Sequence, residues 1–257
     1  MHSRPFAALT IAGSDPSGGA GIQADLKTFH QFGVYGEAVI TLLTVQNTTR
    51  VSRVECLAPA FVIDQLNAVL EDIPPQAAKT GALGNAEIVE AVAEAAKSFR
   101  FPIVVDPVMI SKHGAALIAP DAAESVKRKL IPVATLVTPN LPEAEALTGT
   151  SEPRRAAEQL LRLGAQAALI KGGHAKDNAT DYLLCPDGWY EFPAPHIDTP
   201  HTHGTGCTYS AAITACLAQG VPLADAVARA KAYIMEAIAT NPGLGLGHGP
   251  VNHFANA

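Results

Sequence analysis

Residues 6–32, FAALTIAGSDPSGGAGIQADLKTFHQF, decide the fold. The apolar run Phe6–Ala12 has the composition of a buried strand. A glycine-rich loop follows directly, and residues 21–32 then have the apolar spacing of a helix. A buried strand, a loop and a helix in this order form the first unit of an α/β sheet, where ligands bind beyond the carboxyl ends of the strands.

The same alternation continues along the chain. We expect further strands at residues 38–46, 77–80, 103–105, 136–138 and 167–171, and a hairpin of residues 180–185 and 189–192 around Pro186-Asp187-Gly188. We expect helices at residues 59–72, 85–99, 121–130, 141–147, 153–163, 205–218 and 223–239. The pattern predicts a three-layer α/β/α fold, a central, mostly parallel sheet flanked by helices, formed by residues 1–257 as one domain.

Composition narrows the function classes. The 257 residues are 48% hydrophobic and 16% charged, which suits a large buried core and excludes a disordered chain. A net charge of −6 without a basic stripe argues against nucleic acid and anionic membranes as partners. The four cysteines form no C-x-x-C pair, and no signal peptide or membrane-length apolar run is present, so we expect a cytoplasmic protein.

The stretch His201–Ala212, HTHGTGCTYSAA, predicts an anion site. Its Gly-Thr-Gly turn allows close approach of the backbone to a ligand and stands at the start of the helix expected from Thr205. Free N–H groups and the positive end of the helix dipole attract an anion there, and a phosphoryl group in transfer is our choice. Cys207 falls in the first turn, where we expect an acidified thiol. The alternative is a plain helix cap with a buried cysteine.

Polar residues also stand at the end of three of the expected strands or shortly after it. Asp106 could hold a metal or orient a hydroxyl group, or simply form a turn. Asn140 and Glu143 share a helix face and could bind Mg²⁺ through water, while also fitting a helix cap. Lys171, followed by two glycines, suits a nucleotide phosphate, although an ordinary exposed lysine is the alternative.

Other motifs are weaker. Residues 19–24 match the dinucleotide pattern G-x-G-x-x-A but start several residues after the strand ends, which argues against a dinucleotide site. A phosphate-binding P-loop motif is absent from the sequence. His201 and His203 lack a nearby third metal ligand, so we assign no direct protein ligand for a metal. Asp25 either lies near the glycine-rich loop of a substrate site or is a solvated helix carboxylate.

Taken in order, these motifs resemble a known family. The matching segments are residues 12–27, 45–48, 106–109, 138–144, 171–174, 201–207 and 247–253. Together they closely resemble the hydroxymethylpyrimidine/phosphomethylpyrimidine kinases of thiamine biosynthesis, members of the ribokinase-like superfamily. The resemblance covers essentially the whole chain.

The resemblance implies ATP-dependent phosphorylation, with Mg²⁺, of 4-amino-5-hydroxymethyl-2-methylpyrimidine and then of its monophosphate, with a homodimer as the expected assembly. It implies that the substrate pocket includes Gln46, which bonds the pyrimidine, with Gly13, Asp25 and Val108. Gly204, Gly206 and Cys207 would form the anion hole, with Cys207 as a thiolate that accepts or orients the hydroxyl proton, and Lys171, Asn140, Glu143 and Asp106 would serve ATP and Mg²⁺.

One position departs from the family pattern. Ala82 stands where familiar members have methionine, which leaves a larger pocket. Pyridoxal or pyridoxine therefore remains an alternative substrate. A non-catalytic pyrimidine-binding protein is the third hypothesis, and the intact Gly-Thr-Gly-Cys turn argues against it.

Overall fold

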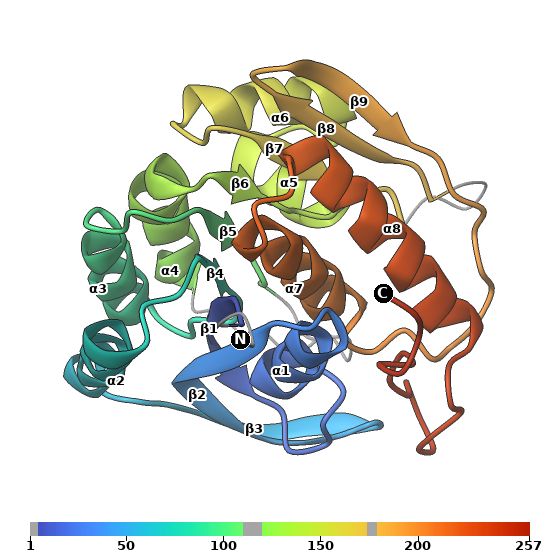
Figure 1. Ribbon diagram of the computed structural model, residues 1–257, viewed down its shortest axis with the longest axis horizontal. Helices are drawn as coiled ribbons and strands as arrows, with labels where there is room; N and C mark the ends of the chain where they lie inside the picture. The colour runs from blue at the N-terminus through green and yellow to red at the C-terminus, as the bar shows by residue number, and fades with distance from the viewer. Residues whose placement is uncertain (1–4, 110–119, 174–178) are drawn as a thin grey trace.

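The computed structural model describes residues 5–109, 120–173 and 179–257. Nine strands within these residues form one sheet, in the order β3-β2-β1-β4-β5-β6-β7-β8-β9 (Figure 1). They are β1 (Ala7–Ser14), β2 (Tyr35–Asn47), β3 (Arg50–Cys56), β4 (Ala77–Thr80), β5 (Ile103–Val105), β6 (Leu136–Val137), β7 (Ala168–Ile170), β8 (Asp181–Cys185) and β9 (Gly188–Phe192). The central strands from β2 to β7 pair in parallel, whereas β3 at one edge and β8 and β9 at the other pair antiparallel.

Helices cover both faces of this sheet (Figure 1). One face carries α1 (Gly21–Gln31), α7 (Thr205–Ala218) and α8 (Leu223–Ala239), and the other carries α2 (Pro59–Asp72), α3 (Ala86–Ala96), α4 (Pro120–Ser125), α5 (Leu141–Thr148) and α6 (Pro153–Arg162). Each face has its own cluster of buried apolar side chains. The alanines of α7 are almost completely buried, which lets this helix lie close to the sheet between α1 and α8. No described helix is long and apolar enough to cross a membrane.

The three-layer, mostly parallel fold is confirmed. The expected bounds match those of α2, α7 and α8, and the hairpin closes with Cys185 opposite Gly188. Strand β3 was not expected from the sequence. The helix expected over residues 121–130 is instead the short α4 followed by a π-helical turn, Val126–Leu130, and a 3₁₀ turn, Ile131–Val133.

Candidate active site

The amino end of α7 opens onto a cavity of about 840 Å³. Gly204 precedes the helix with φ +79°, a left-handed conformation that suits glycine, and no side chain caps the helix there. Within the described residues, we find no hydrogen-bond partner for the backbone N–H of Gly206 or Cys207. These two N–H groups, at the positive end of the helix dipole, are therefore available to an anion.

The cavity lies at the carboxyl ends of the parallel strands, where the α/β topology predicts a ligand. Ten of the eleven site residues expected from the sequence line it: Gly13, Gln46, Asp106, Val108, Asn140, Glu143, Lys171, Gly204, Gly206 and Cys207. Ala82 lines it as well. His174, from the motif of residues 171–174, lies outside the described residues.

Lys171 and Asp106 form an ion pair at the floor of the cavity. Lys171 Nζ lies 3.0 Å from Asp106 Oδ1, and the lysine side chain is 13% exposed. Thr138 and Ser210 each donate a hydroxyl hydrogen bond to the same carboxylate, at 3.2 Å. Burial opposes ionisation of Asp106, but the two ammonium groups of Lys171 and Lys79 bring its pKa below the ordinary value. Lys171 is thus not an ordinary exposed lysine, and the Asp106 side chain faces the site rather than only forming a turn.

Asn140 and Glu143 form a reciprocal helix cap. Asn140 Oδ1 accepts the Glu143 N–H, and Glu143 Oε2 accepts the Asn140 N–H, each at 2.9 Å. Both residues line the cavity. Burial, together with the nearby negative charge of Asp106, raises the pKa of Glu143 to about 7, and Lys171 opposes the shift. The cap expected from the sequence is confirmed, while a role toward Mg²⁺ stays a prediction.

Asp25 does not line the cavity. Its side chain is completely buried, and both carboxylate oxygens accept hydrogen bonds from Lys79 Nζ, at 2.8 and 2.9 Å. Thr10 donates a third bond at 2.6 Å. The expectation of a pocket-lining Asp25 was wrong, as was the alternative of a solvated carboxylate. The sequence signal for this pair is Lys79 within the apolar strand AAKT, because a buried ammonium group requires a partner.

Cys207 has the opposite electrostatic character to the one expected. Burial, reinforced by the negative charges of Asp25 and Asp106, raises the pKa of the thiol to about 12. Lys79 and the Gly21 N–H act against this shift but do not cancel it. The expectation of an acidified thiol was wrong, because loss of hydration outweighs the attraction of the Lys79 charge. At neutral pH the free protein holds Cys207 as a protonated thiol.

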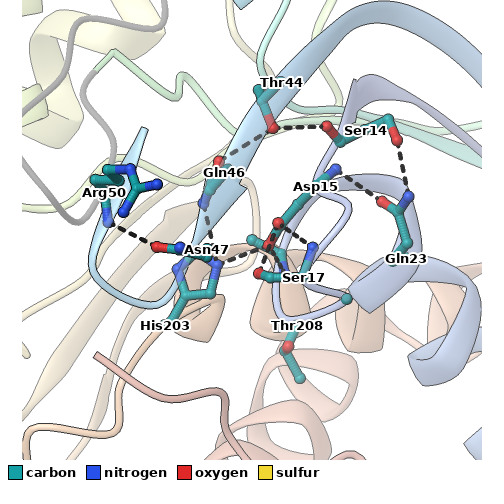
Figure 2. Close-up of polar contacts among 12 residues, drawn as sticks. Ser14, Asp15, Ser17, Gln23, Thr44, Gln46, Asn47, Arg50, His203 and Thr208 are labelled. Atoms are coloured by element: carbon teal, nitrogen blue, oxygen red, sulfur yellow. Dashed lines mark hydrogen bonds and ion pairs between the residues drawn. The ribbon is translucent and has the colours of Figure 1, made fainter. Parts of the chain in front are cut away.

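Sequence reasoning also missed a buried polar chain at the cavity wall (Figure 2). Asp15 Oδ2 lies 2.7 Å from His203 Nε2, and the side chains of both residues are 4% exposed. The same His203 nitrogen lies 3.3 Å from Gln46 Nε2, so the chain reaches the predicted substrate-binding glutamine. Asp15 and His203 are 188 residues apart in the sequence, so no local spacing could have joined them. Within the described residues, no group of three or more His, Cys, Asp or Glu side chains is arranged to hold a metal ion.

Comparisons with known proteins agree with this geometry. The phosphomethylpyrimidine kinase family model matches residues 15–252. The chain is 46% identical to a hydroxymethylpyrimidine/phosphomethylpyrimidine kinase of Bacillus subtilis, over 97% of this chain and 95% of the relative. It is 51% identical, over 97% of its length, to the thiamine biosynthesis bifunctional protein ThiED of Geobacter sulfurreducens, but spans only 52% of that relative.

Solved structures share the fold. The crystal structure of an ADP complex of B. subtilis pyridoxal kinase superposes with a TM-score of 0.90 at 38% sequence identity, covering 98% of both chains. The resemblance seen in the sequence motifs thus extends over nearly the whole length of sequence and structure. The chain belongs to the phosphomethylpyrimidine kinase family.

Proposed function

We propose that the protein transfers the γ-phosphoryl group of ATP to the hydroxymethyl group of 4-amino-5-hydroxymethyl-2-methylpyrimidine, and then phosphorylates the monophosphate to the diphosphate. One observation carries the proposal: the free N–H groups of Gly206 and Cys207 lie at a cavity that Lys171 and Gln46 also line. The names of the relatives support the same reaction, and the ADP complex of the structural neighbour, a pyridoxal kinase, supports ATP as the phosphoryl donor.

The protein's task in phosphoryl transfer is mainly to position the reactants and to stabilise charge. The N–H groups at the start of α7 would donate hydrogen bonds to the oxygens of the migrating phosphoryl group, whose charge spreads in the transition state. Lys171 would offset negative charge on ATP. Gln46 would hold the ring so that its hydroxymethyl group points at the amino end of α7.

Mg²⁺ fits the chemistry of this end of the cavity. Glu143 lines the cavity, and its carboxyl group, once deprotonated, offers the kind of oxygen ligand that Mg²⁺ and its bound waters prefer. Asn140 and Asp106 add oxygen acceptors nearby. When bound, the ion would neutralise phosphate charge, and we propose that Glu143, Asn140 and Asp106 hold it through its waters.

Cys207 then acts as a thiol. With a pKa of about 12, its sulfur would orient the substrate hydroxyl rather than remove the proton. A general base typically contributes about 10²–10⁴-fold, and in a loose transition state the anion-binding N–H groups matter more than the base.

A vitamin B6 ring alcohol is the second candidate substrate. Ala82 lines the cavity, where its short side chain would leave room for a larger ring, and the structural neighbour with a TM-score of 0.90 is a pyridoxal kinase. A coupled ATPase assay with the aminopyrimidine and with pyridoxal, with product mass to count the phosphates added, tests both. A higher kcat/KM for the aminopyrimidine supports the first proposal, and the reverse supports the second. Binding of the aminopyrimidine without ATP turnover would support a non-catalytic protein instead.

Assembly and location are also proposals. We propose a homodimer, because large apolar side chains are exposed: Leu43 and Val45 of β2, with 45% and 57% of their surfaces accessible, and Phe61 of α2 at 56%. Light scattering at micromolar concentration tests this, and a mass near 26.7 kDa would refute it. We propose a cytoplasmic setting, consistent with four free cysteines, which fractionation of the source cells tests.

A further inference from the structure

The inference begins with the protonation of Asp15. Its Oδ1 accepts the backbone N–H of Ser17 at 2.9 Å and the Ser17 hydroxyl at 2.7 Å. Its Oδ2 accepts the Ala20 N–H at 3.0 Å and lies 2.7 Å from His203 Nε2. Burial opposes ionisation, but the hydrogen bonds from His203 and Ser17 bring the pKa of Asp15 below its ordinary value. Asp15 is therefore a carboxylate, which only accepts, and His203 Nε2 must carry the hydrogen that lies between them.

This protonation constrains the Gln46 amide. A ring nitrogen that carries a hydrogen has no in-plane lone pair left and cannot accept a hydrogen bond. The Gln46 atom 3.3 Å from His203 Nε2 therefore has to be an acceptor. At the other end, Thr44 Oγ1 lies 3.0 Å from the Ser14 carbonyl oxygen and 3.3 Å from the amide. The single hydroxyl hydrogen goes to the carbonyl, which cannot donate, and Thr44 then offers the amide only lone pairs.

Both neighbours demand the same orientation. The amide oxygen belongs beside His203 and the amide nitrogen beside Thr44, the reverse of the orientation drawn in Figure 2. The two ends of an amide have nearly the same shape, and the hydrogen-bond network decides which is which. In this orientation the single N–H of His203 is shared between two acceptors, the Asp15 carboxylate and the amide oxygen, and the amide nitrogen donates to Thr44 Oγ1. In the other orientation two donors meet at His203, and sharing a hydrogen cannot relieve that contact.

We propose that Asp15 and His203 are positioning residues that lock the Gln46 amide in this orientation, and that the lock selects the order of donor and acceptor on the substrate ring. The inference rests on the proposed function. The aminopyrimidine carries an acceptor, a ring nitrogen, next to a donor, its amino group. These match the N–H and the C=O of a fixed amide. The 4-oxo analogue carries a ring N–H next to a carbonyl oxygen, the opposite order, and meets like against like at both positions.

The test compares kcat/KM for the aminopyrimidine and its 4-oxo analogue. The wild-type protein should prefer the amino ring by about 10²-fold or more, because the 4-oxo ring leaves two buried polar contacts unsatisfied. His203→Leu removes the N–H that holds the amide, and the preference should fall to about tenfold or less. His203→Gln can still donate to both Asp15 and Gln46 and should restore most of it.

A second pair of variants tests the lock from its other end. Thr44→Val removes the oxygen that accepts the Gln46 N–H and should also weaken the preference. Thr44→Ser keeps that oxygen and serves as the matched control. This pair decides the question if His203→Leu does not fold. A ratio of kcat/KM values is the useful readout, because a general disturbance of the site lowers both values together.

The possible outcomes separate the two proposals. If the ratio of the two kcat/KM values is unchanged in folded His203→Leu and Thr44→Val, the lock is overturned and the proposed function stays intact. This includes the case in which kcat/KM falls by the same factor for both rings. If the wild-type protein phosphorylates neither ring, the proposed function fails, and calorimetry on the same proteins compares Kd for the two rings. A Kd preference that is lost in His203→Leu and restored in His203→Gln then supports the lock, and its absence in the wild-type protein overturns it.

Discussion

Replacing Gly204 with alanine should destabilise the protein far more than the same change at an ordinary left-handed glycine. Gly204 has φ +79°, and a Cβ there would lie 1.7 Å from the carbonyl oxygen of Gly19. Gly149, which ends α5 with φ +77°, has nothing within 4 Å of that position. The two glycines share the conformational cost of a left-handed alanine, about 1–2 kcal/mol, and differ in the close approach.

The close approach sets the difference in magnitude. Relief of the clash requires the Gly19 segment to move away from α7 by about 1 Å or more, since real carbon atoms avoid such contacts. That movement strains the Asp15–His203 bond and the Ala20–Asp15 bond. We expect Gly204→Ala to lower the free energy of unfolding by about 3–5 kcal/mol, within the range of severe single mutations. Gly149→Ala should lower it by only about 1–2 kcal/mol.

Urea denaturation followed by circular dichroism measures both variants under the same conditions. In thermal scans at one heating rate, a chain of this size loses about 2–4 °C of Tm per kcal/mol, so Gly204→Ala should melt about 10 °C lower than the wild-type protein. Gly149→Ala should also keep wild-type kcat, because it lies away from the lining of the cavity. Equal losses of stability in the two variants would refute the reasoning.

Three further changes test the site and its surroundings. Gly206→Val places a side chain over the free N–H groups, with Cβ 3.4 Å from Lys171 Nζ, and should lower kcat by about 10²–10³-fold. Cys207→Ser should lose less activity. A larger loss in Cys207→Ser than in Gly206→Val in steady-state assays would contradict the anion hole. Lys79→Met leaves the buried Asp25 carboxylate without its ammonium partner and should lower the free energy of unfolding in urea by about 3–5 kcal/mol. Adding Asp25→Asn to Lys79→Met should restore at least half of that loss. No recovery in the double variant would argue against the ion pair. Burial and the charge of Asp72 raise the pKa of Glu37 to about 7, so the native state binds the proton more tightly than the unfolded chain, whose pKa is 4.5. The free energy of unfolding should therefore fall as pH rises from 4.5 through 7, and Glu37→Gln should remove this component. Urea denaturation at pH 5 and at pH 8 measures it. The same change in free energy of unfolding between the two pH values in the wild-type protein and in Glu37→Gln would count against it.

The sequence predicts the parts of the fold whose signals are local. Helix α8 follows a clear apolar period, and α7 begins at a Gly-Thr-Gly turn, so their bounds could be predicted. Strand β3 could not, because its residues are exposed or half-buried at the sheet edge and show no apolar alternation. The π-helical turn after α4 has no local sequence signal that we recognise.

The site divides in the same way. Asp106 and Lys171 could be placed together, because parallel strands bring their carboxyl ends to one edge of the sheet. The position of Asp25 depends on Lys79, 54 residues further along, and the protonation of Cys207 depends on burial created by the whole fold. Such long-range packing determines which charges reach the cavity, and the order of residues along the chain does not reveal it.

The turn at His203 has a consequence for the order of events during protein synthesis. Its N–H donates to Gly249 O, and its carbonyl accepts the Val251 N–H, so a short bridge to residues 249–251 holds the start of α7 in place. A ribosome-bound chain that still lacks these residues can build the sheet but cannot close this turn. Stalled chains released before and after residue 251 should therefore differ in nucleotide turnover while sharing most of their secondary structure.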